Sequence, residues 1–165
     1  MTVSQVVFIL LSIAALGGAL GVVFARNLFR SALALVLSFV GVAGFYVLLE
    51  AELLAMIQIL VYVGAIAILI IFAIMLSRRL MSSETLPWNE QWVGAVIVAV
   101  VLFAALVFVL IRVDWPTAEA QVPPDAISLL GQSLVSPDFY VLPFEVASVL
   151  LLVALVGAVI IAREQ

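Results

Sequence analysis

The fold is decided by the stretch ELLAMIQILVYVGAIAILIIFAIML, which runs from Glu52 to Leu76. After its first residue, this stretch carries only two polar side chains, Gln58 and Tyr62. A helix needs about 20 consecutive apolar residues to cross the hydrocarbon core of a bilayer. The stretch therefore predicts a transmembrane helix, beginning near Leu53 and ending at Leu76.

Four further segments have the same character, and together the five predict an all-α integral membrane protein. Apolar residues make up 68% of the 165 residues, and the mean hydropathy is +1.45. A soluble domain averages about half apolar residues, so lipid is the solvent that suits this surface. We expect a single membrane domain over residues 1–165, with a long loop at 113–140. The five helices are expected at Val3 to Ala25, Ser31 to Leu49, Leu53 to Leu76, Val93 to Ile111 and Val141 to Ala162.

The arginines predict the orientation of the chain, because cytoplasmic loops of membrane proteins collect basic residues. Five of the six basic residues fall on one side of the predicted helices, and Arg112 alone falls on the other. The N-terminus should therefore lie outside, the C-terminus in the cytoplasm and the long loop outside. The five are Arg26, Arg30, Arg78, Arg79 and Arg163.

Two connections carry structural information. The turn around Glu50-Ala51-Glu52 is very short, so the second and third helices should be antiparallel neighbours. In the long loop, Pro123-Pro124-Asp125 precedes Ile127, Leu130 and Leu134. This pattern predicts a short interfacial helix, which Pro137 would end.

The residue types that are absent exclude several functions. The chain has no cysteine and no histidine, so it lacks the usual ligands of iron–sulfur clusters, haem and zinc. It also lacks thiol and imidazole nucleophiles. The net charge is −4 and there is no basic run, which argues against nucleic-acid binding. We expect no redox cofactor and no catalytic metal in this chain.

Small residues recur at four-residue spacing in two helices and predict close helix packing. The first helix has Gly17 with Gly21 and Ala14 with Gly18, and the last has Ala154, Ala158 and Ala162 with Gly157 beside them. This spacing places small side chains on one face and lets two backbones approach. They can pack within the chain, but five helices are few to bury every such face. Association with other membrane subunits is the better expectation.

The third helix places its two polar side chains on one face. At about 100° per residue, Ala51, Ala55, Gln58, Tyr62 and Ala65 share a stripe. Polar groups within hydrocarbon usually face the interior of a helix bundle, where a partner or water satisfies them. Gln58 and Tyr62 therefore make either an ordinary interhelical hydrogen bond or part of a functional path.

Gly64 lies off that stripe in the middle of the helix, where glycine costs roughly 1 kcal/mol relative to alanine in water. One explanation is close packing against another helix. The other is a π-bulge, which adds one residue to a turn and often marks a functional site. Forming or removing a bulge would rotate everything beyond it by about 100°.

Two sequence motifs resemble those of one family, chain J of bacterial proton-pumping NADH:quinone oxidoreductase, which is equivalent to mitochondrial complex I subunit 6. The first is QILVYVGAI at Gln58 to Ile66, followed by FAIML at Phe72 to Leu76. The second is LPFEVASVLLLVALVGA at Leu142 to Ala158. The likeness covers all five helices in order and spacing.

The resemblance implies a structural and coupling subunit of a multi-subunit enzyme in a bacterial plasma membrane. In the family, the third helix switches between α and π forms near the tyrosine–glycine pair, and the switch is thought to gate a water path. By that motif, Tyr62 and Gly64 inherit the switch role, with Gln58 beside them. Quinone, flavin and iron–sulfur clusters are expected in partner subunits, and this chain would take no catalytic step itself.

Glu145 has two interpretations. It stands two residues after Pro143 at the start of the last helix, where an acid is favoured by the positive end of the helix and is still wet. The family motif includes this glutamate, so it is also a candidate proton-path or subunit-contact carboxylate. Glu52, at the start of the third helix, has the same two interpretations.

Two other functions remain open at this point. The chain could be a subunit of a related cation antiporter or membrane-bound hydrogenase, because those assemblies share homologous membrane parts. It could also be a free-standing transporter or scaffold. A transporter would usually place more ionisable residues within its spans.

Overall fold

A computed structural model describes residues 2–77, 91–114 and 123–163, and these residues form helices and connecting turns only. Five helical spans are long and apolar enough to cross a membrane. The prediction of an all-α protein with five such spans is confirmed. The arginines Arg78 and Arg79, which contribute to the orientation prediction, lie outside the described residues.

The first two spans are α1 (Val3–Phe24) and α2 (Leu28–Leu48). Helix α2 begins three residues before the predicted start at Ser31. The reason is an N-cap, because the Asn27 side chain accepts hydrogen bonds from the backbone N–H groups of Phe29 and Arg30. Thr2 and Gln5 form a capping box at the start of α1.

Helices α1 and α2 pack at backbone contact. A Cβ atom added at Gly18 would lie 2.6 Å from the backbone nitrogen of Ser38, and one added at Gly41 would lie 2.7 Å from that of Ala15. The small residues of α1 therefore pack within the chain at Gly18. At Gly17, by contrast, an added Cβ would meet nothing within 4 Å.

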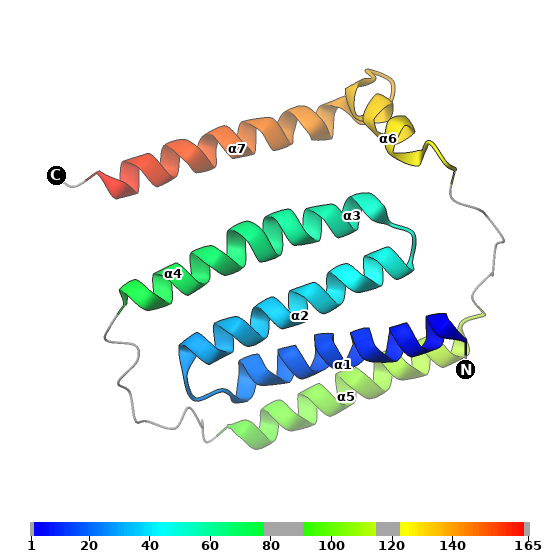
Figure 1. Ribbon diagram of the computed structural model, residues 1–165, viewed down its shortest axis with the longest axis vertical. Coiled ribbons are helices and arrows are strands. Elements are labelled where there is room, and N and C mark those ends of the chain that lie inside the picture. Colours follow the sequence, from blue (N-terminus) through cyan, green and yellow to red (C-terminus); the bar gives the residue numbers. More distant parts are fainter. Residues whose placement is uncertain (1, 78–90, 115–122, 164–165) are drawn as a thin grey trace. The chain divides into compact units, whose positions relative to one another are not determined.

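The turn after α2 reverses the chain tightly. The backbone N–H of Glu50 donates to the carbonyl of Val47 at 3.0 Å, and that of Ala51 donates to Tyr46 at 2.8 Å. This pair of bonds is a Schellman motif, which normally ends on a left-handed glycine. Glu50 occupies the left-handed position here, with φ at 57°. The third span consequently runs back along α2, as predicted, and α2 lies between α1 and this span (Figure 1).

The third span consists of three successive helical pieces. They are α3 (Glu52–Ile57), the π-helix η1 (Gln58–Ala67) and α4 (Ile68–Leu76). The predicted π distortion is confirmed, and it covers ten residues rather than one bulge. In Figure 1 these three pieces form one uninterrupted helix.

The remaining helices are α5 (Trp92–Arg112), α6 (Ala126–Val135) and α7 (Val141–Ala162). Helix α5 belongs to the unit Met1–Glu119, and α6 and α7 form the unit Ala120–Gln165. Helix α6 confirms the predicted short helix in the long loop. It begins after Asp125 and ends before Pro137, as the loop pattern indicated.

Candidate functional site

The π-helix η1 brings two distant residues to the same face of the third span. Gln58 is 7% exposed and Ala67 is 1% exposed, although they lie nine positions apart in the sequence. In an α-helix, nine residues turn through about 900°, which would place the two on opposite faces. The i→i+5 turn of a π-helix takes nearly one residue more, so nine residues make about two full turns. The π geometry therefore sets which face of α4 meets the rest of the chain.

Gln58 is the one polar side chain that is buried among the described residues. Its Nε2 donates a long hydrogen bond, 3.5 Å, to the backbone carbonyl of Phe39 on α2. A polar group in an apolar interior is costly unless it has such a partner. Gln58 is thus a fixed point of contact between η1 and the preceding helix.

Tyr62 contacts the same residue of α2 by its ring. The ring centroids of Tyr62 and Phe39 lie 5.5 Å apart, with the ring planes at 80°, an edge-to-face arrangement. The Tyr62 side chain nevertheless remains 42% exposed. The structure therefore brings Gln58 and Tyr62 together on Phe39, through its backbone and its side chain respectively.

The predicted stripe of the third helix is wrong in its second half. Ala55 and Gln58 are buried as expected, but Ala65 is exposed and Ala67 is buried in its place. The prediction assumed a rotation of about 100° per residue throughout the helix. Each residue of η1 turns by less than that, so the next buried position comes two residues later, at Ala67 instead of Ala65.

Gly64 lies within η1, where its missing side chain matters to the helix itself. A Cβ added there would meet only the carbonyl oxygen of Ile59, at 3.3 Å, within a 4 Å radius. Ile59 precedes Gly64 by five residues, which is the spacing of a π-type hydrogen bond. No atom of another described helix is near that position. Packing against another described helix thus does not explain Gly64, and the contact that a side chain there would make is with the π turn itself.

Glu145 is exposed near the start of α7, in the unit Ala120–Gln165. It stands four residues after Val141, the first residue of that helix. It thus belongs to a different unit from Gln58, Tyr62 and Gly64, which lie together in η1.

Sequence reasoning missed Phe39. A signal for it existed in the spacing around the tight turn at Glu50, because Phe39 precedes that turn by nearly as many residues as separate Tyr62 from it. In an antiparallel helix pair, residues at equal distances from the turn lie side by side. Pairing the two helices about Glu50 would have identified Phe39 as the neighbour of Tyr62.

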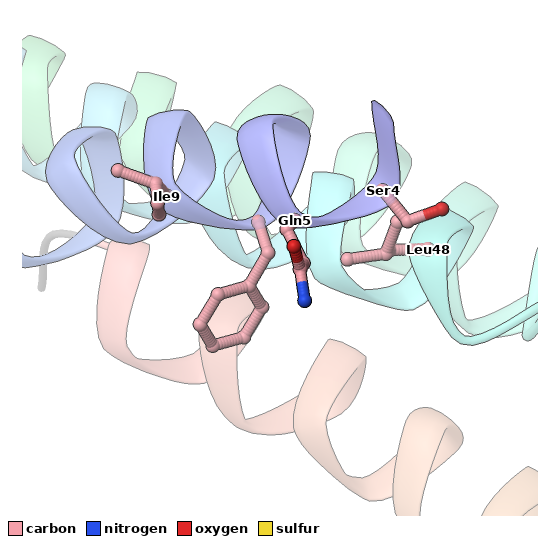
Figure 2. Close-up of a pocket in the computed structure, with 5 residues that line it drawn as sticks. Ser4, Gln5, Ile9 and Leu48 are labelled. Carbon is pink, nitrogen blue, oxygen red and sulfur yellow. The ribbon is translucent and has the colours of Figure 1, made fainter. Parts of the chain in front are cut away.

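A surface hollow of about 410 Å³ lies elsewhere, between the start of α1 and the end of α2. Its lining has no ionisable side chain, and Gln5, labelled in Figure 2, is engaged in capping α1. The hollow is lined by Ser4, Gln5, Phe8, Ile9 and Leu48. No group of three or more metal-ligating side chains occurs among the described residues either. The π-helix is therefore the candidate functional site.

These features define a helical, multi-pass membrane protein whose third span departs from α geometry at a polar, glycine-containing segment. Comparison with known proteins agrees with that class. The family model for NADH-ubiquinone/plastoquinone oxidoreductase chain 6 matches residues 18–161. The chain belongs to this family, and it is a membrane subunit of a multi-subunit, complex I-type quinone oxidoreductase.

Individual relatives are similar over nearly the whole chain. NAD(P)H-quinone oxidoreductase chain 6 of Synechocystis sp. is 39% identical, over 99% of this chain and 82% of its own length. The chloroplastic NAD(P)H-quinone oxidoreductase subunit 6 of Anthoceros angustus is 38% identical, over 98% of this chain and 84% of its own. F(420)H(2) dehydrogenase subunit J of Methanosarcina mazei is 36% identical, over 96% and 90%. The family match decides against a free-standing transporter.

Proposed function

We propose that this chain couples quinone reduction to proton translocation by a change of helix type in its third span. The observation that carries the proposal is the burial of both Gln58 and Ala67, which requires the π geometry of η1. A segment that can form either i→i+4 or i→i+5 bonds has two discrete states, which is what a switch requires.

The change of state would act on α4. Conversion of η1 to α geometry would turn α4 relative to α3 by about half a turn. Ala67 would leave the face that it shares with Gln58, and a bulkier side chain would take its place. Such an exchange alters the space beside α2, where a chain of water molecules could form or be broken.

The polar groups of the span would serve that water path. Gln58 and the exposed Tyr62 are the polar side chains that η1 offers within the hydrocarbon. Polar groups at membrane depth usually mark paths of ions or protons. Glu145 would serve as a carboxylate at the start of α7, either on the path or at a contact with a neighbouring subunit.

The chain would take no electron-transfer step itself. It has no cysteine or histidine to hold an iron–sulfur cluster or haem, so quinone, flavin and clusters would bind to partner subunits. The names of the relatives support this division, because they state different electron donors, NAD(P)H and F(420)H(2), for chains of similar sequence. We expect the purified chain to bind no haem, flavin or iron.

The arginine pattern supports an N-terminus outside and a C-terminus in the cytoplasm. We assign the chain to a bacterial plasma membrane, where other membrane subunits and lipid would cover its exposed apolar helices.

The test is the number of protons pumped per electron, normalised to the content of assembled complex, in two variants. In Gly64→Val, a branched side chain would crowd the carbonyl of Ile59, which lies 3.3 Å from the first added carbon. We expect the Gly64→Val complex to assemble and to reduce artificial acceptors, but to pump fewer protons per electron. Tyr62→Phe removes only a hydroxyl and should have a milder effect. A normal ratio in Gly64→Val, with less complex assembled, would show that this glycine serves packing alone.

A further inference from the structure

Helix α2, which lies beside the π-helix η1, is held in place by close contacts with α1. Its backbone touches that of α1 at Gly18 and Gly41, where no space remains for a Cβ atom. In addition, the Ser38 hydroxyl donates a hydrogen bond of 2.9 Å to the carbonyl of Ala15. Two helices held at such close range cannot slide or rotate past each other without losing these contacts.

Phe39, the residue after Ser38, presents two different groups to η1. Its backbone carbonyl accepts the 3.5 Å hydrogen bond from Gln58, and its ring meets the ring of Tyr62 edge to face. The two contacts lie four residues apart on η1, so they hold about one turn of the helix in a fixed rotation.

The part of η1 beyond Tyr62 has no such contact at Gly64. A Cβ atom added at Gly64 would have only one atom within 4 Å, the carbonyl oxygen of Ile59 in the same helix. The first half of η1 is thus anchored to α2, and the glycine after it leaves the backbone free of side-chain contact. A change of helical pitch beyond this anchor, between Tyr62 and Ala67, would then turn α4 while the anchored turn stays in place.

From these contacts we infer that Phe39 is a positioning residue for coupling. It clamps Gln58 and Tyr62 to α2, so that a change between π and α geometry in η1 turns α4 while α3 stays in place. This inference rests on the proposed function, since it names the residue that gives the proposed switch its direction.

The same helix offers a matched control. Phe45 also lies on α2 and makes an aromatic contact, with ring centroids 5.5 Å apart, but its partner is Phe8 of α1. Phe39→Leu and Phe45→Leu therefore remove the same group from the same helix, the first from a ring contact with η1 and the second from a ring contact with α1. Phe39→Tyr keeps the ring and should restore normal behaviour.

The experiment measures the distance between two spin labels in the assembled complex, at rest and during turnover. Non-canonical amino acids carrying the labels would replace Leu37 on α2 and Leu69 on α4, two exposed positions. With Gln58 to Tyr62 held, the remaining residues of η1 would turn α4 by about a quarter turn, which moves a label by several ångströms on a helix about 10 Å in diameter. In the wild-type complex we expect two distances whose populations change between rest and turnover.

Comparison of the variants then separates the positioning role of Phe39 from the switch in η1 itself. Because α3 is no longer held against α2 without the aromatic contact, Phe39→Leu should broaden both distance distributions. It should also lower proton pumping per electron, while Phe45→Leu and Phe39→Tyr leave both quantities near those of the wild type. Two distances in the wild type with equal behaviour of Phe39→Leu and Phe45→Leu would overturn the role of Phe39 and leave the switch standing. A single unchanged distance in the wild-type complex would overturn the switch itself.

Discussion

Ser38 of α2 hydrogen-bonds to the carbonyl of Ala15 on α1 at the place where Gly18 approaches the Ser38 backbone most closely. The two helices share a short polar contact there, and the glycine makes it possible. Within a membrane, such small-residue crossings supply packing and interhelical hydrogen bonds in place of the hydrophobic effect.

Gly18→Ala should therefore destabilise the α1–α2 pair. The added methyl would lie 2.6 Å from the Ser38 nitrogen, a backbone atom that cannot turn away. Overpacking of this kind typically costs about 1–3 kcal/mol. We expect less assembled complex in Gly18→Ala membranes, with pumping per assembled complex close to normal.

Gly17→Ala is the control for that variant, because an added Cβ at Gly17 meets nothing within 4 Å in this chain. Equal loss of complex in both variants would mean that the α1–α2 crossing is not what Gly18 serves. The readout is the amount of the intact complex on native gels of solubilised membranes.

The turn at Glu50 predicts a stabilising substitution. A left-handed backbone costs a residue with a Cβ atom roughly 1 kcal/mol or more relative to glycine, partly offset by the greater freedom of glycine in the unfolded chain. Glu50→Gly should therefore raise the melting temperature of the detergent-solubilised complex slightly. Glu50→Ala removes the carboxylate but keeps the strained φ of 57°, so it should bring no such gain. A gain from alanine equal to that from glycine would assign the effect to charge rather than to backbone strain.

The helices could be predicted from the sequence because their signals are local. Apolar length alone located all five spans, and the proline and aspartate before Ala126 located α6. Asn27 could have corrected the start of α2, since asparagine is a strong N-cap. Gly64 alone left close packing and a π-bulge open, and the family resemblance pointed to the π geometry that the structure has.

The extent of the π-helix and the role of Phe39 depend on contacts between helices, which a single sequence does not reveal. The ten-residue extent of η1 shifted the buried position from Ala65 to Ala67, and no local pattern marks where π geometry begins or ends. Pairing the helices about Glu50 could have placed Phe39 beside Tyr62, but the bond from Gln58 goes to the Phe39 backbone carbonyl, and a backbone acceptor carries no sequence signal.

The predicted orientation can be checked with topology reporters. If the arginine pattern governs insertion, a reporter fused after Gln165 should be cytoplasmic and one inserted near Thr117 should be external. Reporters active in one compartment only, such as alkaline phosphatase outside and a fluorescent protein inside, distinguish the two. The opposite pattern would mean that the chain has the reverse orientation in the membrane. Any proton path would then open from the other side.

The central claim is that η1 changes between π and α geometry as the complex works. It is tested most directly by high-resolution electron cryomicroscopy of the intact complex, frozen at rest and during turnover, with the density of residues 52–76 compared between the classes. We expect one class in which Gln58 and Ala67 share a face, as here, and another in which α4 has turned by about half a turn and Ala67 has left that face. Identical π geometry from Gln58 to Ala67 in every class, with protons pumped throughout, would contradict the account.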